Sequence, residues 1–125
     1  MSDLKKKIVV VEDEVDILEL ENMILTNAGY EVFLCENGRD ALELIKEVRP
    51  HLVILDIMLP GMDGKAIVSA IAEDEDINNT SILIVSALEE SQRMFLGVPQ
   101  VKDFCLKPFR STTLLQKVKA IMGDE

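Results

Sequence analysis

The sequence predicts a doubly wound α/β domain, in which a mostly parallel sheet is covered by helices on both faces. Two observations support this class: five short runs rich in β-branched residues, and longer stretches between them whose apolar residues recur every three to four positions. The short runs are apolar almost throughout, which is typical of strands buried on both faces. Because right-handed crossovers place helices on either side of a parallel sheet, the alternation favours this layered arrangement.

The expected strands are short apolar runs between polar or turn-forming residues. They are Lys7 to Val11, Tyr30 to Cys35, Leu52 to Leu55, Ser81 to Val85 and Val101 to Leu106. Helices are expected in the intervals between these runs and after the last one.

Four of the helical intervals have a clear apolar face. In the first, this face consists of Ile17, Leu20, Ile24 and Ala28, and Gly29 closes the helix. The inward residues expected in the other three are Ala41, Ile45 and Val48; Ile67 and Ile71; and Leu114, Val118 and Ile121.

Boundary residues can be assigned to these helices as well. The second helix is expected to open near Asn37 and to stop before Pro50, and the third follows the Asp63-Gly64 pair. Ser111 is the expected N-cap of the last helix. The remaining interval, residues 88 to 97, has the poorest helical pattern. Gly97 and the residues after it predict a helix that stops early and a loop that leads into the last strand.

Composition limits the function. The 125 residues suit one domain, and a net charge of −10 argues against direct nucleic-acid binding, which depends on Lys and Arg that neutralise phosphates. The two cysteines form no CxxC motif, which fits a reducing cytoplasm. The N-terminal apolar run is too short for a signal peptide or a membrane span, so neither export nor membrane association is expected.

Ionisable and hydroxyl side chains follow four of the strands. The first strand leads into Glu12 and Asp13, the third into Asp56, the fourth into Ser86 and the fifth into Lys107. In an open parallel sheet the ligand crevice lies at the carboxyl ends of the strands, so these groups are expected to meet there. Most of these groups, taken alone, could be a helix cap or a solvated loop residue. Asp56 is different, because it ends the most hydrophobic run in the chain, which solubility does not explain. The conjunction of all five groups at successive strand ends predicts a site.

The chemistry of these groups points to a metal-assisted phosphoryl site. Converging carboxylates repel one another unless a cation neutralises them. A ligand set of oxygens without His or Cys selects a hard ion, Mg²⁺ with Mn²⁺ as an alternative. A phosphoryl group moving to a carboxylate needs its charge neutralised, which the metal, Lys107 and the Ser86 hydroxyl can do together.

The motifs IVVVEDE at 8–14, LVILDIMLPGMDG at 52–64, ILIVSA at 82–87 and KPF at 107–109 resemble the response regulator receiver family, the CheY-like superfamily of two-component signal transduction. The match runs over almost the whole chain, so residues 1–125 are expected to form one receiver domain. The resemblance implies a flavodoxin-like sheet of order 2-1-3-4-5. On this order Cys35 and Cys105 lie on opposite edge strands and stay unpaired.

The resemblance also implies roles for individual residues. Asp56 is the expected phosphoacceptor. Asp13, Asp56 and the backbone carbonyl of Met58 are expected to bind Mg²⁺, with Glu12 acting through water. Lys107 is expected to pair with the phosphoryl oxygens. The peptide bond between Lys107 and Pro108 is expected to be cis.

The implied switch is formed by Ser86, drawn toward the phosphate, and Phe104, which turns inward and changes partner affinity. The implied phosphoryl donor is a sensor histidine kinase or a phosphotransfer protein. It must be external, since His51 lies roughly 16 Å from Asp56 along the strand. The downstream protein or output domain is not identified by the sequence.

The chain is expected to act as a switch and not as an enzyme, with autophosphotransfer and autodephosphorylation as its only chemistry. An aspartyl-phosphate hydrolase would need a second acid where Met58 stands, and a flavin module would need a phosphate-binding loop after the first strand. A degenerate receiver that binds partners without phosphorylation is the alternative. It is kept open by Gln100 and Val101, which replace the Gly-Ala pair usual before the aromatic switch residue.

Overall fold

A five-stranded sheet forms the centre of the molecule. The computed structural model describes residues 5–58, 63–87 and 89–124. The strands are β1 (Lys7–Val11), β2 (Glu31–Cys35), β3 (Leu52–Leu55), β4 (Ser81–Ser86) and β5 (Val101–Leu106). Their order is β2-β1-β3-β4-β5, and all four pairings are parallel. The predicted class and strand order are confirmed, with single-residue differences at the start of β2 and the end of β4.

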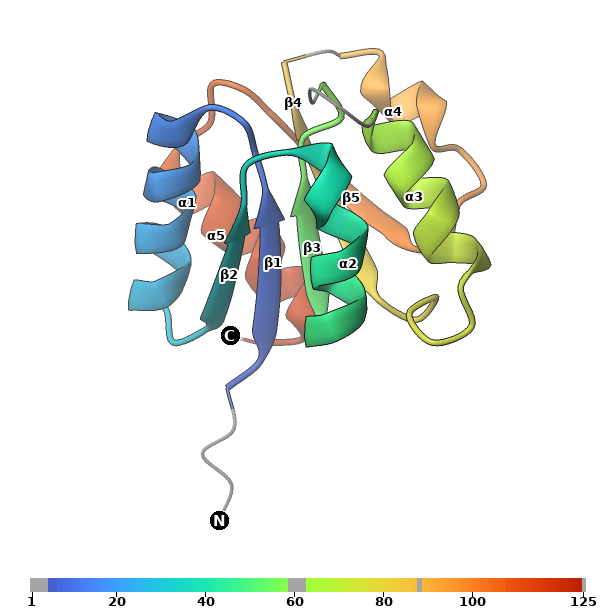
Figure 1. Cartoon of the computed structure of the whole chain (residues 1–125). Helices are drawn as coiled ribbons and strands as arrows, with labels where there is room; N and C mark the ends of the chain where they lie inside the picture. The colour runs from blue at the N-terminus through green and yellow to red at the C-terminus, as the bar shows by residue number, and fades with distance from the viewer. Residues whose placement is uncertain (1–4, 59–62, 88, 125) are drawn as a thin grey trace.

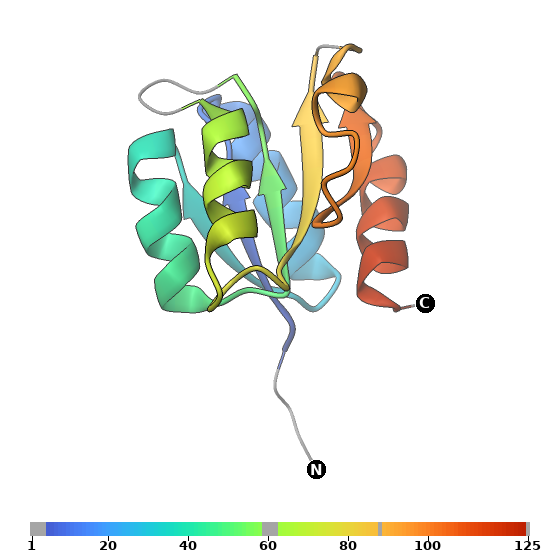
Figure 2. The same ribbon diagram turned by 90° about the vertical axis from the view of Figure 1, so that its right-hand side faces the viewer.

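Helices cover both faces of this sheet (Figure 1). They are α1 (Val15–Asn27), α2 (Gly38–Val48), α3 (Gly64–Glu73), α4 (Ser91–Met94) and α5 (Ser111–Met122). Seen after a quarter turn, α2 and α3 lie on one side of the sheet and α5 on the other (Figure 2). Right-handed crossovers between parallel strands produce this two-sided arrangement.

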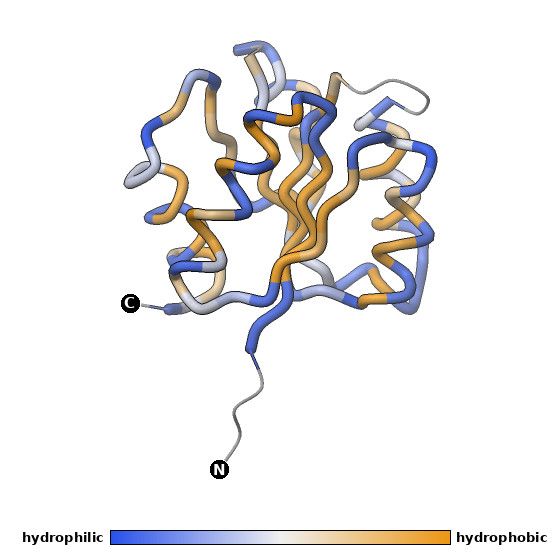
Figure 3. The backbone as a smooth tube through the Cα atoms, turned by 60° about the vertical axis from the view of Figure 1, so that its left-hand side comes forward, coloured by the Kyte–Doolittle hydropathy of each residue, from blue (hydrophilic) through white to orange (hydrophobic). Residues whose placement is uncertain are grey.

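The sheet separates two hydrophobic clusters. Val9 belongs to the cluster under α2 and α3, whereas its neighbours Ile8 and Val10 belong to the cluster under α1 and α5. Successive strand residues point to opposite faces, so strands covered on both sides must be apolar at every position. The apolar strands run together through the middle of the molecule in Figure 3, and polar residues gather at the strand ends.

The buried face of α1 differs from the predicted one. Its fully buried residues are Leu18, Glu21 and Leu25, whereas Ile17 and Leu20 are only partly buried. The prediction was correct in part, because Ile24 and Ala28 of the predicted face pack against the cluster under α1 and α5. It followed apolar residues alone, and the centre of the buried face lies one residue further along the helix and contains a glutamate.

Two helix starts can be compared with the predictions. Asn37 caps α2 as expected, because its Oδ1 accepts from the Asp40 N–H at 2.9 Å. Ser111 is not the cap of α5 but its first helical residue. The N-cap position belongs to Arg110, which makes no side-chain cap hydrogen bond.

The segment between β4 and β5 contains little helix. The only helix in its described part, α4, has four residues and ends at Met94, and Gly97 then takes a left-handed backbone with φ of 83°. The early stop predicted for this helix is confirmed. Leu88, at the start of the predicted interval, lies outside the described residues.

Both cysteines are free and buried, and they lie on the two edge strands, β2 and β5. The prediction that they stay unpaired is confirmed. No helix in the described ranges is both long enough and apolar enough to cross a membrane.

Candidate functional site

The acids predicted at the strand ends converge beyond β1 and β3. Val11 pairs with Leu55, so the next residues, Glu12 and Asp56, leave the two strands at the same level. The Asp56 N–H donates to the Val11 carbonyl at 3.0 Å and holds this level past the strand end. Carboxylate oxygens of Glu12, Asp13 and Asp56 lie within 4.8 Å of one another. Glu12 and Asp56 are buried and Asp13 is exposed.

Lys107 places a positive charge against these acids. It follows β5, where its N–H donates to the Ser86 carbonyl at 3.0 Å. Its ammonium nitrogen lies 2.7 Å from Glu12 Oε1 and 2.9 Å from Asp56 Oδ2. The bond from Lys107 to the following proline is cis, as the family resemblance implied.

The sequence analysis did not assign a role to Glu14, which also approaches this lysine. Its exposed carboxylate lies 3.5 Å from the Lys107 ammonium. Its N–H donates to Glu12 Oε2 at 3.2 Å and helps to orient that buried acid. The run of three acids at positions 12 to 14 was the available signal.

The electrostatics of the site reflect burial and pairing. Burial raises the pKa of Glu12 to about 7, against hydrogen bonds from Lys107 and the Glu14 N–H, and the charge of Asp56 adds to the rise. Burial by itself would lower the pKa of Lys107. Hydrogen bonds to Glu12 and Asp56 outweigh burial and raise that pKa, so the lysine stays charged.

The donor set fits a hard divalent cation. Two of the three clustered carboxylates are buried, and the nearby ammonium of Lys107 cannot neutralise all three charges. Oxygen-only ligands suit Mg²⁺. The Met58 N–H donates to Asp56 Oδ1 at 2.9 Å, so the backbone at Met58 borders the site. The metal-binding role of the Met58 carbonyl stays a prediction, and residues 59–62 of the same motif lie outside the described residues.

The two predicted switch residues lie on adjacent strands. Ser86 ends β4 and is buried, and Phe104 in β5 is paired with Ile84 of β4. The Phe104 ring is partly buried and stacks on the ring of Phe95, with centroids 6.4 Å apart and 27° between the planes. The aromatic residue at the switch position therefore contacts the segment between β4 and β5 directly. This segment, which contains α4, is called the α4 segment below.

Glu21 is the second acid that the sequence analysis missed. It lies in the middle of α1 with 1% of its surface exposed, and its Oε2 has no hydrogen-bond partner in the described structure. Burial raises its pKa to about 8, and the charges of Glu12 and Asp56 add to the rise while Lys107 opposes it. The carboxyl is therefore protonated near neutral pH.

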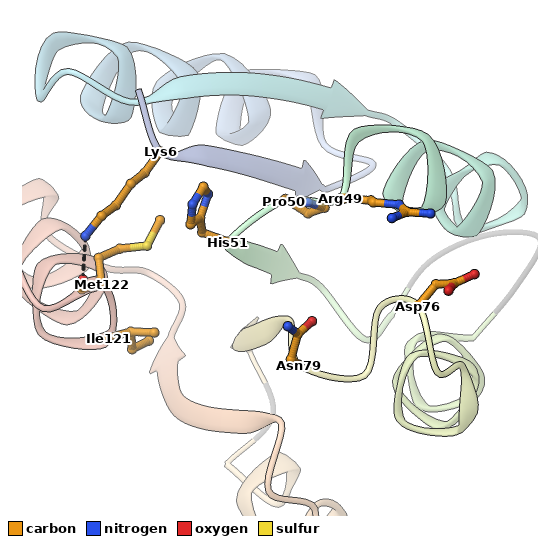
Figure 4. A pocket seen from close by; sticks show the side chains of 8 residues that line it. All are labelled: Lys6, Arg49, Pro50, His51, Asp76, Asn79, Ile121 and Met122. Atoms are coloured by element: carbon orange, nitrogen blue, oxygen red, sulfur yellow. Dashed lines mark hydrogen bonds between the residues drawn. The ribbon is translucent and has the colours of Figure 1, made fainter. Parts of the chain in front are cut away.

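His51 lies at the opposite end of the sheet from these acids. It precedes β3, its Nδ1 accepts from the Lys7 N–H at 3.0 Å, and it lines a pocket of about 490 Å³ with Lys6 and Arg49 (Figure 4). Lys6 at this pocket is already occupied, because its ammonium donates to the Met122 carbonyl and to Asp124. The predicted separation of His51 from Asp56 agrees with these positions.

Comparisons with known proteins agree with this geometry. Residues 8–119 match the family model of the response regulator receiver domain. The DNA-binding response regulator MtrA of Mycobacterium tuberculosis is 30% identical over 121 residues, which are 96% of this chain and 52% of that protein. The chain thus spans about half the length of the curated relatives it matches.

Solved structures give the same fold. The chemotaxis response regulator CheY4 of Vibrio cholerae has a TM-score of 0.87 at 28% identity, over 94% of this chain and 99% of that one. The receiver domain of the sensor histidine kinase PA1611 of Pseudomonas aeruginosa, solved with a magnesium ion in its active-site cleft, has a TM-score of 0.85 at 24% identity, over 97% of this chain and 100% of that one. This second match concerns the fold alone. With its strand order, its strand-end acids and the family match over residues 8–119, the chain belongs to the response regulator receiver family of two-component systems.

Proposed function

We propose that the chain is a phosphoacceptor switch that receives a phosphoryl group on Asp56 from a sensor histidine kinase or a phosphotransfer protein. The observation that carries the proposal is the position of the Asp56 carboxylate. It is buried, paired with Lys107 at 2.9 Å, and within 4.8 Å of two further carboxylates that can hold a cation. In the transfer, a phosphorus–nitrogen bond of the donor histidine breaks as a phosphorus–oxygen bond to Asp56 forms.

The residues around Asp56 have separate tasks in this proposal. Glu12, Asp13, Asp56 and the Met58 carbonyl would hold Mg²⁺, which when bound neutralises charge on the phosphoryl oxygens. Lys107 moves from Asp56 Oδ2 to a phosphoryl oxygen, because the carboxylate loses its negative charge when it is phosphorylated. Its position between Glu12 and Asp56 keeps it within reach of both states.

The output step depends on Ser86 and Phe104. The Ser86 hydroxyl donates to a phosphoryl oxygen and draws the end of β4 toward the site. Because Phe104 lies on the adjacent strand and stacks on Phe95, this movement changes the packing of the α4 segment. A partner or output domain that contacts this region then gains or loses affinity.

Residues 1–125 would act as one receiver domain in the cytoplasm, where both free cysteines would stay reduced. The chain would signal through protein partners, with no direct nucleic-acid contact, given its net charge of −10. The clustered acids and the Lys107–Asp56 pair support phosphorylation over the phosphorylation-independent alternative.

Mass spectrometry tests the phosphoacceptor. Incubation with acetyl phosphate and Mg²⁺ is expected to add one phosphoryl group to the intact protein, and Asp56→Asn is expected to abolish this gain. Asp63→Asn, which changes an exposed acid that caps α3, serves as the control and should still be phosphorylated. A wild-type protein without the added mass would refute the proposal.

Thermal unfolding tests the metal site separately. A ligand that binds only the folded state stabilises it by roughly 2 to 3 kcal/mol at a hundredfold excess over its dissociation constant. Mg²⁺ is therefore expected to raise the unfolding midpoint of the wild type, and Asp13→Ala should remove that increase. The control is Asp16→Ala, an exposed acid in the first turn of α1 that is outside the carboxylate cluster. Equal midpoints with and without Mg²⁺ in the wild type would show that the metal assignment is wrong.

A further inference from the structure

One face of α3 borders a groove of about 180 Å³ beside the α4 segment. Its lining residues on this helix are Lys65, Val68, Ser69, Ala72 and Glu73. They recur at intervals of three and four positions, so they form a single stripe along the helix. Figure 1 shows this helix beside the segment that contains α4. The stripe has charged ends and small residues in its middle.

The opposite wall of the groove is apolar and incompletely covered. Met94 and Phe95 line it, and Met94 keeps 40% of its surface exposed. Leu96, the next residue, has 80% exposed, the highest value among the large apolar residues described as exposed. Since α4 ends at Met94, no further helical turn follows to cover these side chains. Exposed apolar side chains gathered beside a groove are typical of a contact surface.

The α3 stripe has opposite charges at its two ends, so it complements a second, antiparallel copy of itself. Lys65 and Glu73 are exposed, and neither has an ion-pair partner among the residues that the structure describes. Eight positions separate them, about 12 Å along a helix axis. Ser69 stands midway and is small and exposed. A second α3 placed antiparallel, with the twofold axis beside Ser69, brings each Lys65 opposite the other copy's Glu73.

We propose that this groove is the interface of a twofold symmetric dimer, with a second copy of this chain as its occupant. A twofold interface needs a surface that complements itself, and the stripe meets this condition in charge. The small Ser69 and Ala72 let the two helices approach, and Met94 and Leu96 lose exposed apolar surface. The net charge of −10 per chain opposes association, but charges further apart than about 8 Å are screened at physiological ionic strength.

Cysteine cross-linking tests the position of the axis. A cysteine at residue 69 lies next to its symmetry mate, within the reach of a disulfide. Ser69→Cys is therefore expected to give a covalent dimer under mild oxidation. Ala66→Cys, on an exposed position of the same helix outside the stripe, is the matched control and should cross-link at least about tenfold more slowly. Cys35 and Cys105 are buried and do not compete. Equal cross-linking at both positions would overturn the proposed geometry.

Charge exchange tests the pairing itself. Sedimentation of the wild type is expected to show a monomer–dimer equilibrium between about 10 µM and about 1 mM, the range of weak interfaces. Lys65→Glu and Glu73→Lys alone should each weaken the dimer about tenfold, because each creates two like-charge contacts. The double variant should restore wild-type association. A wild type that stays monomeric throughout, or a double variant no better than the single ones, would refute the dimer and leave the groove to a different partner.

Discussion

Replacing Glu21 with leucine is expected to stabilise the protein by roughly 3 kcal/mol near pH 7 and to remove a pH dependence from its folding. The unfolded chain releases the Glu21 proton near its ordinary pKa of 4.5, whereas the folded protein keeps it up to about pH 8. Between these values each pH unit disfavours the folded state by up to about 1.4 kcal/mol. This loss of folding free energy is absent below pH 4.5 and reaches its full size above pH 8. Leucine removes it and adds an apolar side chain to the cluster of Leu18 and Leu25.

Glu21→Gln separates the titration from the packing. The amide has the shape of the protonated acid, so the two proteins should have similar unfolding free energies at pH 5. They should diverge progressively as the pH rises to 8, with the glutamine variant more stable. Urea unfolding at four pH values in Mg²⁺-free buffer measures this, with the exposed Glu19→Gln as the control. Parallel curves for wild type and Glu21→Gln would show that Glu21 does not hold a proton in the folded state.

The charged groups that shift the pKa of Glu21 come from several elements, and they set how strongly the stability depends on pH. Glu12 and Asp56 raise its pKa, and Lys107 lowers it. Burial raises the pKa of the Cys105 thiol on β5, the charge of Lys117 lowers it, and the charge of Glu21 adds to the rise. A charged Glu21 would have no ion-pair partner of its own among the described residues.

The strand ends could be predicted from sequence because the topology leaves few choices. Once β1, β3, β4 and β5 are parallel neighbours, the residues that follow them must meet at one edge of the sheet. Asp56 was the strongest indication, since it ends the most hydrophobic run in the chain. The structure brings it together with Glu12, Asp13 and Lys107 as expected. Their chemical roles remain predictions until phosphorylation and metal binding are measured.

Other features could not be predicted because they depend on tertiary environment. Glu21 has no local signal of burial: on a helix a glutamate normally indicates the solvent face, and here its position opposite the sheet overrides that preference. The same glutamate explains why the observed centre of the buried face of α1 differs from the predicted one, since the prediction counted apolar residues only. At Ser111, a residue favoured at caps lies one position inside the helix, within the usual uncertainty of helix boundaries. Propensity locates the start of such a helix only to within a residue or two.

Gly64→Ala is expected to damage both folding and phosphorylation, because the glycine allows a close approach of two backbone segments. A Cβ at this position would overlap the Ile57 Cα and lie 3.0 Å from the Ile57 Cβ. Normal contacts between carbon atoms are about 3.5 to 4 Å, so the start of α3 and the backbone at Ile57, two residues past β3, must separate. Overpacking of this kind typically destabilises by about 1 to 3 kcal/mol. The Gly64 N–H donates to the Ile57 carbonyl at 3.1 Å, and that bond should be strained as well.

The displacement should reach the site because Ile57 directly follows Asp56, and the Met58 N–H holds Asp56 Oδ1. A shift of about 1 Å in a reacting group can slow a reaction about a hundredfold, so phosphorylation of Asp56 should fall far more than stability alone would explain. The control is Gly123→Ala, where φ is 74° but the added Cβ would have no close contact with any described residue that is distant in the sequence. This variant should lose some stability through its backbone while keeping the wild-type phosphorylation rate in folded protein. If Gly64→Ala is phosphorylated as fast as Gly123→Ala, the close approach at Ile57 does not position the phosphoacceptor.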